Sequence, residues 1–305
     1  MKISIIGAGN VGGTAALRLA QENIGDIFLF DIAENLARAK AYDLADARQA
    51  LGMDYHVTGT SDFEQLKNSD IVVITAGLAR KPGMTREDLA SKNASILKQV
   101  CHNIRQYCQR AVVVVVTNPL DLMTRVCINS LNFKKTSVLG MGLTLDASRF
   151  ANLIAEQFNV PVSKVVPCVI GSHGEGMMPL ARFTFVNGTC LKQLLPEEEV
   201  NQLISRTIGR GAEIVSLYGT GSAYYAPSAA IAELVKAIAQ DKRCVLGVSC
   251  YLNGQYGVKD VCAGLPCVIG KNGIEEIVQL DLDQNEKESF LKACQGIKEQ
   301  FSRIQ

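Results

Sequence analysis

The sequence predicts an α/β protein in which a doubly wound parallel sheet is followed by a mixed α+β region. The chain has 305 residues, 48% of them apolar, which is enough for a large core and two domains. In its first half, short β-branched runs alternate with amphipathic stretches. After about Leu143 the pattern changes to mixed helices and short strands. We therefore expect one domain over residues 1–143 and a second over residues 144–305.

The first half reads as a β-α-β series. Its expected strands are apolar runs at residues 2–7, 26–31, 56–60, 70–77, 111–116 and 137–142. Helices are expected between them, from Val11 to about Glu22, through the late thirties and forties, from Thr85 to about Cys108, and once more before residue 137. Because β-α-β crossovers are right-handed, this order predicts a parallel sheet with helices on both faces.

The second half carries signals of antiparallel hairpins and a closing helix. Strand candidates that end in Asn-Gly or Lys-Asn-Gly turns lie at residues 182–188, 245–254 and 266–273. Near the end, helical spacing of apolar residues predicts a packed C-terminal helix that buries Phe290, Cys294, Ile297 and Phe301. We find no repeat and no low-complexity linker, so the second domain should pack tightly on the first.

Composition argues against several classes of partner. Lys plus Arg (31) nearly balance Asp plus Glu (30), and without a dense basic run we expect no nucleic acid. The longest apolar run, at residues 111–116, is far too short to span a bilayer, so we expect no membrane insertion. The first residues already form a strand, with no apolar leader before it, which points to the cytoplasm.

The ten cysteines show no C-x-x-C spacing, and most lie in apolar periodic segments. Buried thiols are the simplest interpretation. With only three histidines in the chain, few ligands are available for zinc. We expect no metal site and no disulfide.

The segment GAGNVGG joins the first strand to the first helix and contains G-x-G-x-x-G as Gly7, Gly9 and Gly12. Glycines allow a tight turn and a close approach of the backbone, and the helix offers its N-terminal N–H groups to a pyrophosphate. Asn10 and Val11 in the same turn are further candidate cofactor contacts. An ordinary glycine turn is the alternative, but the flanking strand and helix favour a dinucleotide.

Asp31 ends the second strand, nineteen residues after Gly12. A carboxylate at this place accepts hydrogen bonds from both hydroxyls of a ribose and repels a 2′-phosphate. The sequence therefore predicts NAD as the cofactor, in preference to NADP.

His173 stands in the segment GSHGE, directly after an apolar run. A glycine-rich backbone can present a histidine at the open end of a strand, where it can exchange a proton near neutral pH. His102, within a helical pattern, is better explained by packing. The alternative for His173 is a merely solvated loop histidine.

Three arginines are candidates for binding an anionic substrate. Arg80 and Arg86 flank Pro82 and Gly83 directly after the expected strand at residues 70–76, at the carboxyl end where doubly wound sheets bind ligands. A hinged loop there could close over a substrate and exclude water. The alternative is a solvated basic loop.

The third arginine, Arg149, follows Asp146 by three residues near a helix N-terminus, so both side chains project from one face. Such a pair is usually a surface ion pair of small worth. If His173 lies close, Asp146 could orient its ring while Arg149 grips a substrate carboxylate. The sequence alone does not show that proximity.

Asn118 and Val116 mark the end of the strand at residues 111–116, where the chain reads TNPLD. The Asn118 amide could hydrogen-bond the nicotinamide ribose or the reacting oxygen, and Val116 is a further candidate cofactor contact. An Asn-Pro turn that simply ends a strand is the alternative.

With these residues assembled, the chain resembles the lactate/malate dehydrogenase family, and within it the malate dehydrogenases of the lactate-dehydrogenase-like bacterial type. The resemblance spans essentially the whole chain. It rests on six segments that occur in the family's order: GAGNVGG, ARKPGMTR, TNPLD, LDASR, GSHGE and GSAYYAP. It implies a Rossmann fold for the first domain, a substrate-binding second domain, NAD as cofactor, and a homodimer or homotetramer.

The resemblance also implies a role for each candidate in the substrate pocket. His173 would be the acid/base and Asp146 its partner, and Arg149 would bind the C1 carboxylate of the substrate. Arg86 would be the lid residue that polarises the reacting carbonyl. Arg80 would bind the second carboxylate of oxaloacetate or malate.

Other residues also fit the family, and two residues depart from it. Asn118 matches a residue that touches substrate and cofactor, and Asn93 matches another cofactor contact. Residues 219–227 resemble the segment that closes the pocket wall. Glu175 stands where the family usually has aspartate, and Ala79 where some relatives have proline.

The implied activity is the reversible transfer of hydride between NADH and oxaloacetate, giving (S)-malate, a reaction of the tricarboxylic acid cycle. Lactate dehydrogenase is the nearest alternative, although Arg80 does not suit the methyl group of pyruvate. A non-catalytic dinucleotide sensor would leave the histidine, aspartate and arginines unexplained. An NAD-dependent glycosidase would need a metal site, for which the sequence offers no obvious ligands.

Overall fold

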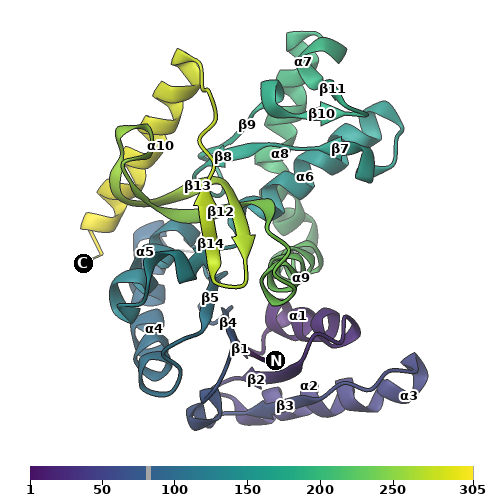
Figure 1. Cartoon of the computed structure of the whole chain (residues 1–305), viewed down its shortest axis with the longest axis vertical. Helices are drawn as coiled ribbons and strands as arrows, with labels where there is room; N and C mark the ends of the chain where they lie inside the picture. Colours follow the sequence, from purple (N-terminus) through teal and green to yellow (C-terminus); the bar gives the residue numbers. More distant parts are fainter. Residues whose placement is uncertain (80–83, 305) are drawn as a thin grey trace.

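The computed structural model describes residues 1–79 and 84–304, and an eleven-stranded sheet runs through its centre (Figure 1). The first six strands are parallel, in the order β3-β2-β1-β4-β5-β6. They are β1 Lys2–Ile6, β2 Asp26–Phe30, β3 Val57–Thr60, β4 Ile71–Ile74, β5 Val112–Val115 and β6 Val138–Gly140. This is the strand order of a doubly wound sheet, so the predicted fold class is confirmed.

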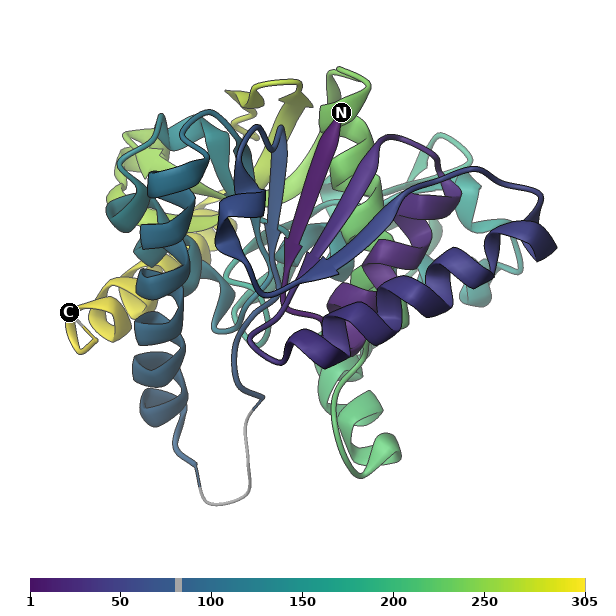
Figure 2. The same cartoon turned by 90° about the horizontal axis from the view of Figure 1, so that it is seen from below.

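Helices cover both faces of these strands. Helices α4 and α5 pack together on one face, and α1 and α2 lie on the other (Figures 1 and 2). Their bounds, with the short α3, are α1 Asn10–Gln21, α2 Glu34–Asp46, α3 Arg48–Leu51, α4 Arg86–Tyr107 and α5 Leu120–Leu131. Helix α4 begins and ends where the sequence predicted. Thr85 and Asp88 form a capping box at its start, and Cys108 is its C-cap.

The second half extends the same sheet with antiparallel strands. Strand β12 pairs with β6, where Ser249 lies opposite Gly140, and the order continues β12-β13-β8-β9 with β14 on β13. These strands are β8 Val169–Gly171, β9 Met177–Pro179, β12 Cys244–Asn253, β13 Lys259–Gly270 and β14 Gly273–Ile277. The two halves therefore share one hydrogen-bonded sheet, which is a closer union than the tight packing of two domains that we expected.

A smaller sheet and five helices complete the second half. The order of this sheet is β11-β10-β7, and the Asn187-Gly188 turn between β10 and β11 confirms that predicted hairpin. The remaining strands and helices are β7 Val165–Val166, β10 Phe185–Val186, β11 Thr189–Cys190, α6 Gly142–Phe158, α7 Leu191–Leu194, α8 Glu197–Tyr218, α9 Tyr225–Ala239 and α10 Gln284–Ser302. Short 3-10 turns lie at η1 Phe63–Leu66, η2 Lys135–Ser137, η3 Val162–Lys164, η4 Ala181–Phe183 and η5 Gln255–Gly257.

Apolar side chains from both halves form the main core. Strands β4 and β5, with the sequences IVVI and VVVV, are buried along their whole length. The same core includes Leu265 of β13 and Ile231 of α9. Helix α10 buries Phe290, Cys294 and Ile297 as its spacing predicted, whereas Phe301, in its last turn, is only half-buried. All ten cysteines are free thiols and seven are buried.

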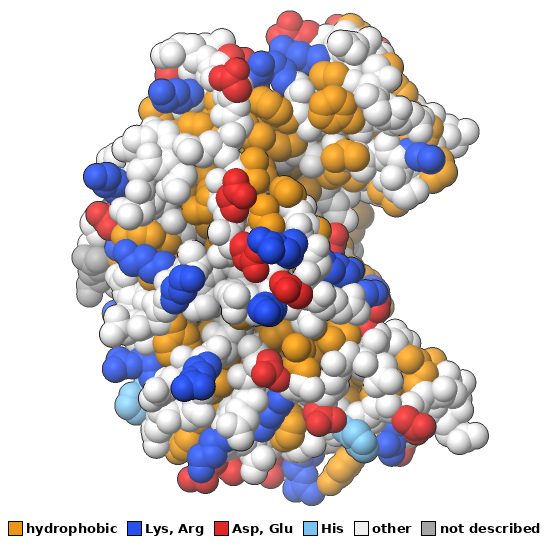
Figure 3. All heavy atoms as spheres, viewed as in Figure 1, with side chains coloured by type: hydrophobic (Ala, Val, Ile, Leu, Met, Phe, Trp, Pro, Cys, Tyr) orange, Lys and Arg blue, Asp and Glu red, His pale blue; other side chains and the backbone are white. Residues whose placement is uncertain are grey.

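Other features of the described residues bear on the expected partners. Acidic and basic side chains are interspersed over the face in Figure 3. Among residues 1–79 and 84–304, no helix is long and apolar enough to cross a bilayer. The same residues hold no cluster of three or more His, Cys, Asp or Glu side chains arranged to bind a metal ion.

Candidate active site

The glycine turn lies between β1 and α1 and leaves its backbone open. A Cβ on Gly12 would lie 1.9 Å from the carbonyl oxygen of Gly7, so the two segments can approach only without a side chain. Gly7 has φ +114°, which favours glycine. A Cβ on Gly9 would meet nothing within 4 Å, and no side chain caps the start of α1. This open helix N-terminus fits a pyrophosphate.

Asp31 follows β2 and lies beside this turn. Its Oδ2 accepts a hydrogen bond from the backbone N–H of Ala8 at 2.7 Å, and its Oδ1 accepts one from Ala33 at 2.9 Å. Lys40, which sequence reasoning missed, donates from Nζ to the carbonyl oxygen of Gly9 at 2.9 Å. Burial lowers the pKa of Lys40, and the charge of Asp31 opposes that shift. A lysine on an amphipathic helix gives no sequence signal of this contact.

Asn93 braces two loops at the carboxyl ends of β4 and β5. Its side chain is fully buried, and its Oδ1 accepts from the backbone N–H of Leu78 at 2.8 Å. Its Nδ2 donates to the carbonyl oxygen of Asn118 at 2.7 Å. The side chain of Asn118 itself is exposed, and Val116 is half-buried. Asn93 thus fixes the two loops between which Asn118 stands.

His173, Asp146 and Arg149 lie together in the structure. His173 Nδ1 and Asp146 Oδ2 are 2.7 Å apart, and Arg149 donates to Asp146 Oδ1 at 3.3 Å. Asp146 is fully buried, whereas His173 follows β8 and keeps 15% of its side chain exposed. Helix α6 supplies the aspartate and the arginine from one face. The three side chains therefore have the proximity that the predicted acid–base and carboxylate-binding roles require.

Burial and charge act in opposite directions on this cluster. Burial lowers the pKa of His173, but the charge and hydrogen bond of Asp146 outweigh it, so that the pKa is raised overall. Burial lowers the pKa of Arg149, and Asp146 opposes this shift. The Nε of Arg149 is buried and has no hydrogen-bond partner among the described residues. A buried guanidinium with an unused donor fits a carboxylate ligand.

A second buried carboxylate, Asp121, lies behind His173. It accepts hydrogen bonds from the backbone N–H of His173 and from the hydroxyls of Ser172 and Ser249. The sequence TNPLD gives no signal of this role, because an acidic residue in the first turn of a helix is explained by the helix dipole alone. The contact with Ser249 depends on the pairing of β12 with β6, which the sequence does not reveal.

Arg86, the first residue of α4, pairs with Glu175 on the loop that carries His173. One guanidinium nitrogen donates to Glu175 Oε2 at 3.0 Å, and a second pairs with Oε1. Both side chains are largely exposed. Arg80 lies outside the described residues. Arg86 therefore reaches the loop of His173, although here it binds Glu175.

The segment at residues 219–227 joins α8 to α9 and includes the first three residues of α9. Helix α9 packs on α1, the helix that follows the glycine turn. Arg18 of α1 donates to the Ser228 hydroxyl at 3.0 Å, which ties the two helices together. Helix α8 approaches Arg149, because a Cβ on Gly211 would lie 3.5 Å from its NH1. The segment thus connects the helices beside the glycine turn and beside the arginine.

A doubly wound sheet with an open glycine turn, and a histidine paired with a buried aspartate, define the class of dinucleotide-dependent oxidoreductases. Residues 1–140 match the NAD binding domain of lactate/malate dehydrogenase, and residues 143–305 match its alpha/beta C-terminal domain. The chain belongs to the lactate/malate dehydrogenase family. The predicted family and its NAD cofactor are confirmed.

Proteins similar to this chain include both malate dehydrogenases and lactate dehydrogenases. The chain is 46% identical to a malate dehydrogenase of Methanosarcina acetivorans over 99% of each chain. The crystal structure of Cryptosporidium parvum malate dehydrogenase has a TM-score of 0.96 and 40% identity, covering 99% of this chain and 98% of that one. A lactate dehydrogenase of the same organism, complexed with lactic acid and NAD, has a TM-score of 0.95 and 35% identity, covering 99% and 97%.

Proposed function

We propose that this chain is an NAD-dependent malate dehydrogenase that transfers hydride reversibly between NADH and oxaloacetate. Family membership and the 46% identity to a malate dehydrogenase support this function. The observation that carries it is the cluster of His173, Asp146 and Arg149, with a proton-carrying ring and a carboxylate-binding guanidinium side by side. A sensor without catalysis would have no use for that pairing.

NAD, when bound, supplies the hydride chemistry, and the protein's own residues move the proton and orient the substrate. Asp146 holds Nδ1 of His173, so Nε2 is the ring nitrogen left to give a proton to the carbonyl oxygen and to take it back from malate. Arg149 binds the C1 carboxylate through its free donors. Arg86 releases Glu175 and binds the carbonyl oxygen of the substrate, on which negative charge develops. This interaction is stronger in the transition state than in the ground state.

The cofactor is proposed to lie along the carboxyl ends of β1, β2, β4 and β5. Asp31 takes the adenosine ribose, which favours NAD over NADP. The open N-terminus of α1 takes the pyrophosphate. The proposed cofactor contacts are Gly7, Gly9, Asn10, Val11, Gly12, Asp31, Asn93, Val116 and Asn118.

Substrate choice is the point on which malate and lactate dehydrogenases differ, and the fold does not separate them, because solved structures of both kinds superpose equally well. Arg80 is the proposed partner of the second carboxylate of oxaloacetate. NADH oxidation by the purified protein should be compared with oxaloacetate, pyruvate and 2-oxoglutarate side by side. Preference for oxaloacetate is expected, whereas preference for pyruvate would assign the chain to the lactate enzymes.

The assembly, location and domain division complete the proposal. A homodimer or homotetramer is supported by exposed apolar side chains at the end of α8 and the start of α9, where Leu217 is 82% and Tyr225 59% exposed. A cytoplasmic location is supported by ten free cysteines. We place the domain division after residue 143, within the first turn of α6.

A further inference from the structure

Asp121 is a buried carboxylate that the proposed mechanism does not use. It lies in the first turn of α5 and is 4% exposed. Its Oδ2 accepts hydrogen bonds from the Ser172 hydroxyl and from the backbone N–H of His173, both at 2.9 Å. Its Oδ1 accepts a bond from the Ser249 hydroxyl at 2.6 Å. One side chain thus joins α5, the loop after β8, and strand β12.

The bond to the backbone N–H of His173 adds to the contacts that hold this loop, in which Ser172 N–H donates to the carbonyl oxygen of Gly176 and Met177 N–H to that of Gly174. Gly171 and Gly174 lie on either side of the histidine with φ of +95° and +94°, a backbone conformation that favours glycine. Asp146 holds the ring of His173 at Nδ1, and Asp121 holds its backbone N–H. Two carboxylates therefore fix the two ends of the same residue.

Charge gives Asp121 a second effect on the histidine. The charged groups that act on His173 among the described residues are Asp146 and Arg149 on α6 and Asp121 on α5. Arg210 of α8 acts on Arg149 and is paired with Glu213. Arg86 and Glu175 pair with each other at the exposed rim, and the negative charge of Asp146 balances the positive charge of Arg149. Asp121 is then the group that matches a protonated His173.

We propose that Asp121 is a positioning residue for His173, holding its backbone in place and supplying the negative charge that balances the protonated ring. The proposal rests on the proposed function, in which His173 carries the proton. Without that charge, a protonated His173 would leave the buried cluster with a net positive charge, which burial disfavours. With it, the cluster is neutral in the state that gives a proton to the substrate.

The protonation state of Asp121 is the point that an experiment must address. Burial raises the pKa of Asp121, while the bond from Ser249, the charge of His173 and the bonds from Ser172 and the His173 backbone oppose that shift. The backbone N–H can only donate, so Oδ2 accepts in either state. A neutral Asp121 would be mimicked by asparagine. An ionised one would not, which makes Asp121→Asn informative.

The Asp121→Asn variant can keep the contacts while it removes the charge. The amide oxygen can accept from Ser172 and His173, and the amide nitrogen can donate to Ser249, whose hydroxyl also accepts. The chain has only three histidines, so their ring signals can be titrated by NMR in the ligand-free protein, with His173→Asn assigning the signal of His173. We expect the midpoint of His173 to fall by about one pH unit in Asp121→Asn.

A matched control removes the same charge elsewhere. Asp62 caps a 3-10 turn on the exposed surface, and asparagine is as good an N-cap as aspartate, so Asp62→Asn should keep the fold. The titration midpoint of His173 should be unchanged in this variant. If Asp121→Asn does not fold, Ser249→Ala provides the test. Loss of the hydrogen bond from Ser249 favours the neutral form of Asp121, so the titration midpoint of His173 should also fall. A folded variant of either kind with an unchanged midpoint would overturn the proposal.

Activity supplies a separate measurement. The pH profile of kcat/KM for oxaloacetate reduction should move to lower pH in Asp121→Asn by the same amount as the NMR midpoint, whereas simple structural damage lowers the whole profile without moving it. A wild-type protein inactive on oxaloacetate would refute the proposed function, and the NMR titration of the ligand-free protein would still test Asp121. A downward NMR shift supports the role of Asp121, and a fixed midpoint contradicts it.

Discussion

At the scale of single residues, His173 should carry the proton of the reaction. His173→Asn keeps a polar side chain that cannot exchange a proton, so turnover should fall by about two to four orders of magnitude while NADH binding changes little. Stopped-flow or steady-state rates with a fluorescence titration of NADH would measure both. Near-normal turnover in this variant would remove His173 from the mechanism.

The sign of the pH dependence follows from the raised pKa of His173. Reduction of oxaloacetate needs the protonated ring, so it should persist above the ordinary histidine pKa and fail as pH rises through the raised value. Oxidation of malate needs the neutral ring and should fail as pH falls through that value. The same shift stabilises the folded state below the unfolded pKa, and that contribution is lost as pH rises through the folded pKa.

Asp31 should decide between the two dinucleotides. Its carboxylate would meet the 2′-phosphate of NADPH as a like charge, so Asp31→Ser should improve kcat/KM for NADPH relative to NADH by about tenfold or more. Lys40 lies beside the same turn, and Lys40→Met in the Asp31→Ser background should reverse part of the gain if its ammonium meets the phosphate. Because Asp31 also binds Ala8 and Ala33, melting temperatures must accompany the kinetics. An unchanged ratio in a stable variant would argue against this role.

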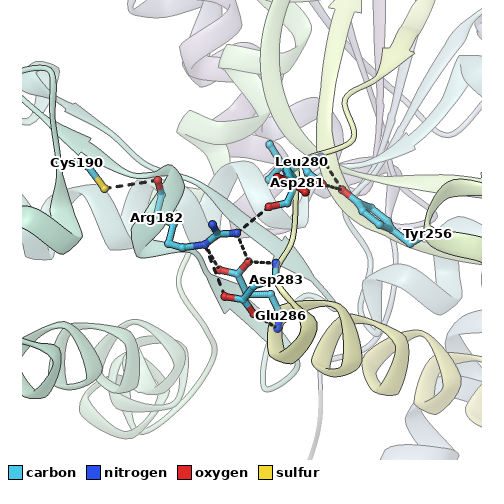
Figure 4. A network of polar contacts seen from close by, with 7 residues as sticks. All are labelled: Arg182, Cys190, Tyr256, Leu280, Asp281, Asp283 and Glu286. Carbon is cyan, nitrogen blue, oxygen red and sulfur yellow. Dashed lines mark hydrogen bonds and ion pairs between the residues drawn. The ribbon is translucent and has the colours of Figure 1, made fainter.

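At the scale of elements, helix α10 is held by a network at its start (Figure 4). Asp283 and Glu286 form a capping box, each accepting from the other's backbone N–H at 2.9 Å. Arg182 donates to both oxygens of Glu286 at 3.1 and 2.8 Å and to the carbonyl oxygen of Asp281 at 2.7 Å. The network joins the start of α10 to the segment after β9.

Loss of Glu286 should therefore weaken the attachment of α10. Glu286→Ala removes the reciprocal cap and leaves Arg182 without its main partner, and should lower the free energy of unfolding by about 1–2 kcal/mol in urea denaturation. Glu288→Ala is the matched control, because Glu288 is exposed on the same helix and should cost less than about 0.5 kcal/mol. Equal effects of the two changes would show that the network adds nothing to stability.

The elements could be predicted because their signals are local. The apolar runs of β4 and β5 and the Thr85 cap of α4 lie within a few residues of sequence, and the structure has them there. The pairing of β12 with β6 could not be predicted, since Ser249 and Gly140 are far apart in the chain and carry no pattern of their own. That pairing places Ser249 against Asp121, so the carboxylate behind His173 was missed for the same reason.

Sequence motifs pointed to individual candidate residues of the site, but not to the long-range contacts between them. The residues alone suggested that Asp146 and Arg149 act with His173 if the three are close, and the family resemblance implied it. The fold brings the loop after β8 onto α6 and places them together. Lys40 lies in no motif, and Asp121, although it ends the segment TNPLD, is not distinguished there from an ordinary acid at a helix start. Long-range contacts, which depend on the whole topology, carry this part of the site.

At the scale of the whole molecule, the shared sheet predicts that the two halves unfold together. Strands β6 and β12 are hydrogen-bonded, α6 crosses residue 143, and one core includes Val113 and Leu265. The chain has no tryptophan, so Phe63→Trp and Phe183→Trp would each report on one half by fluorescence. We expect both reporters to give one coincident urea transition.

Ligand binding makes the same test sharper, because NADH is expected to contact the first half alone. If the halves are coupled, NADH at 100 times its Kd should stabilise both by about 2.7 kcal/mol, and both reporters should shift to the same higher urea midpoint. Separate transitions, with only the Phe63→Trp signal moved by NADH, would mean that the β6–β12 pairing does not couple the halves. The positions of Asp121 and Ser249 behind His173 would then depend on a weak junction, because this pairing is what brings β12 to the active site.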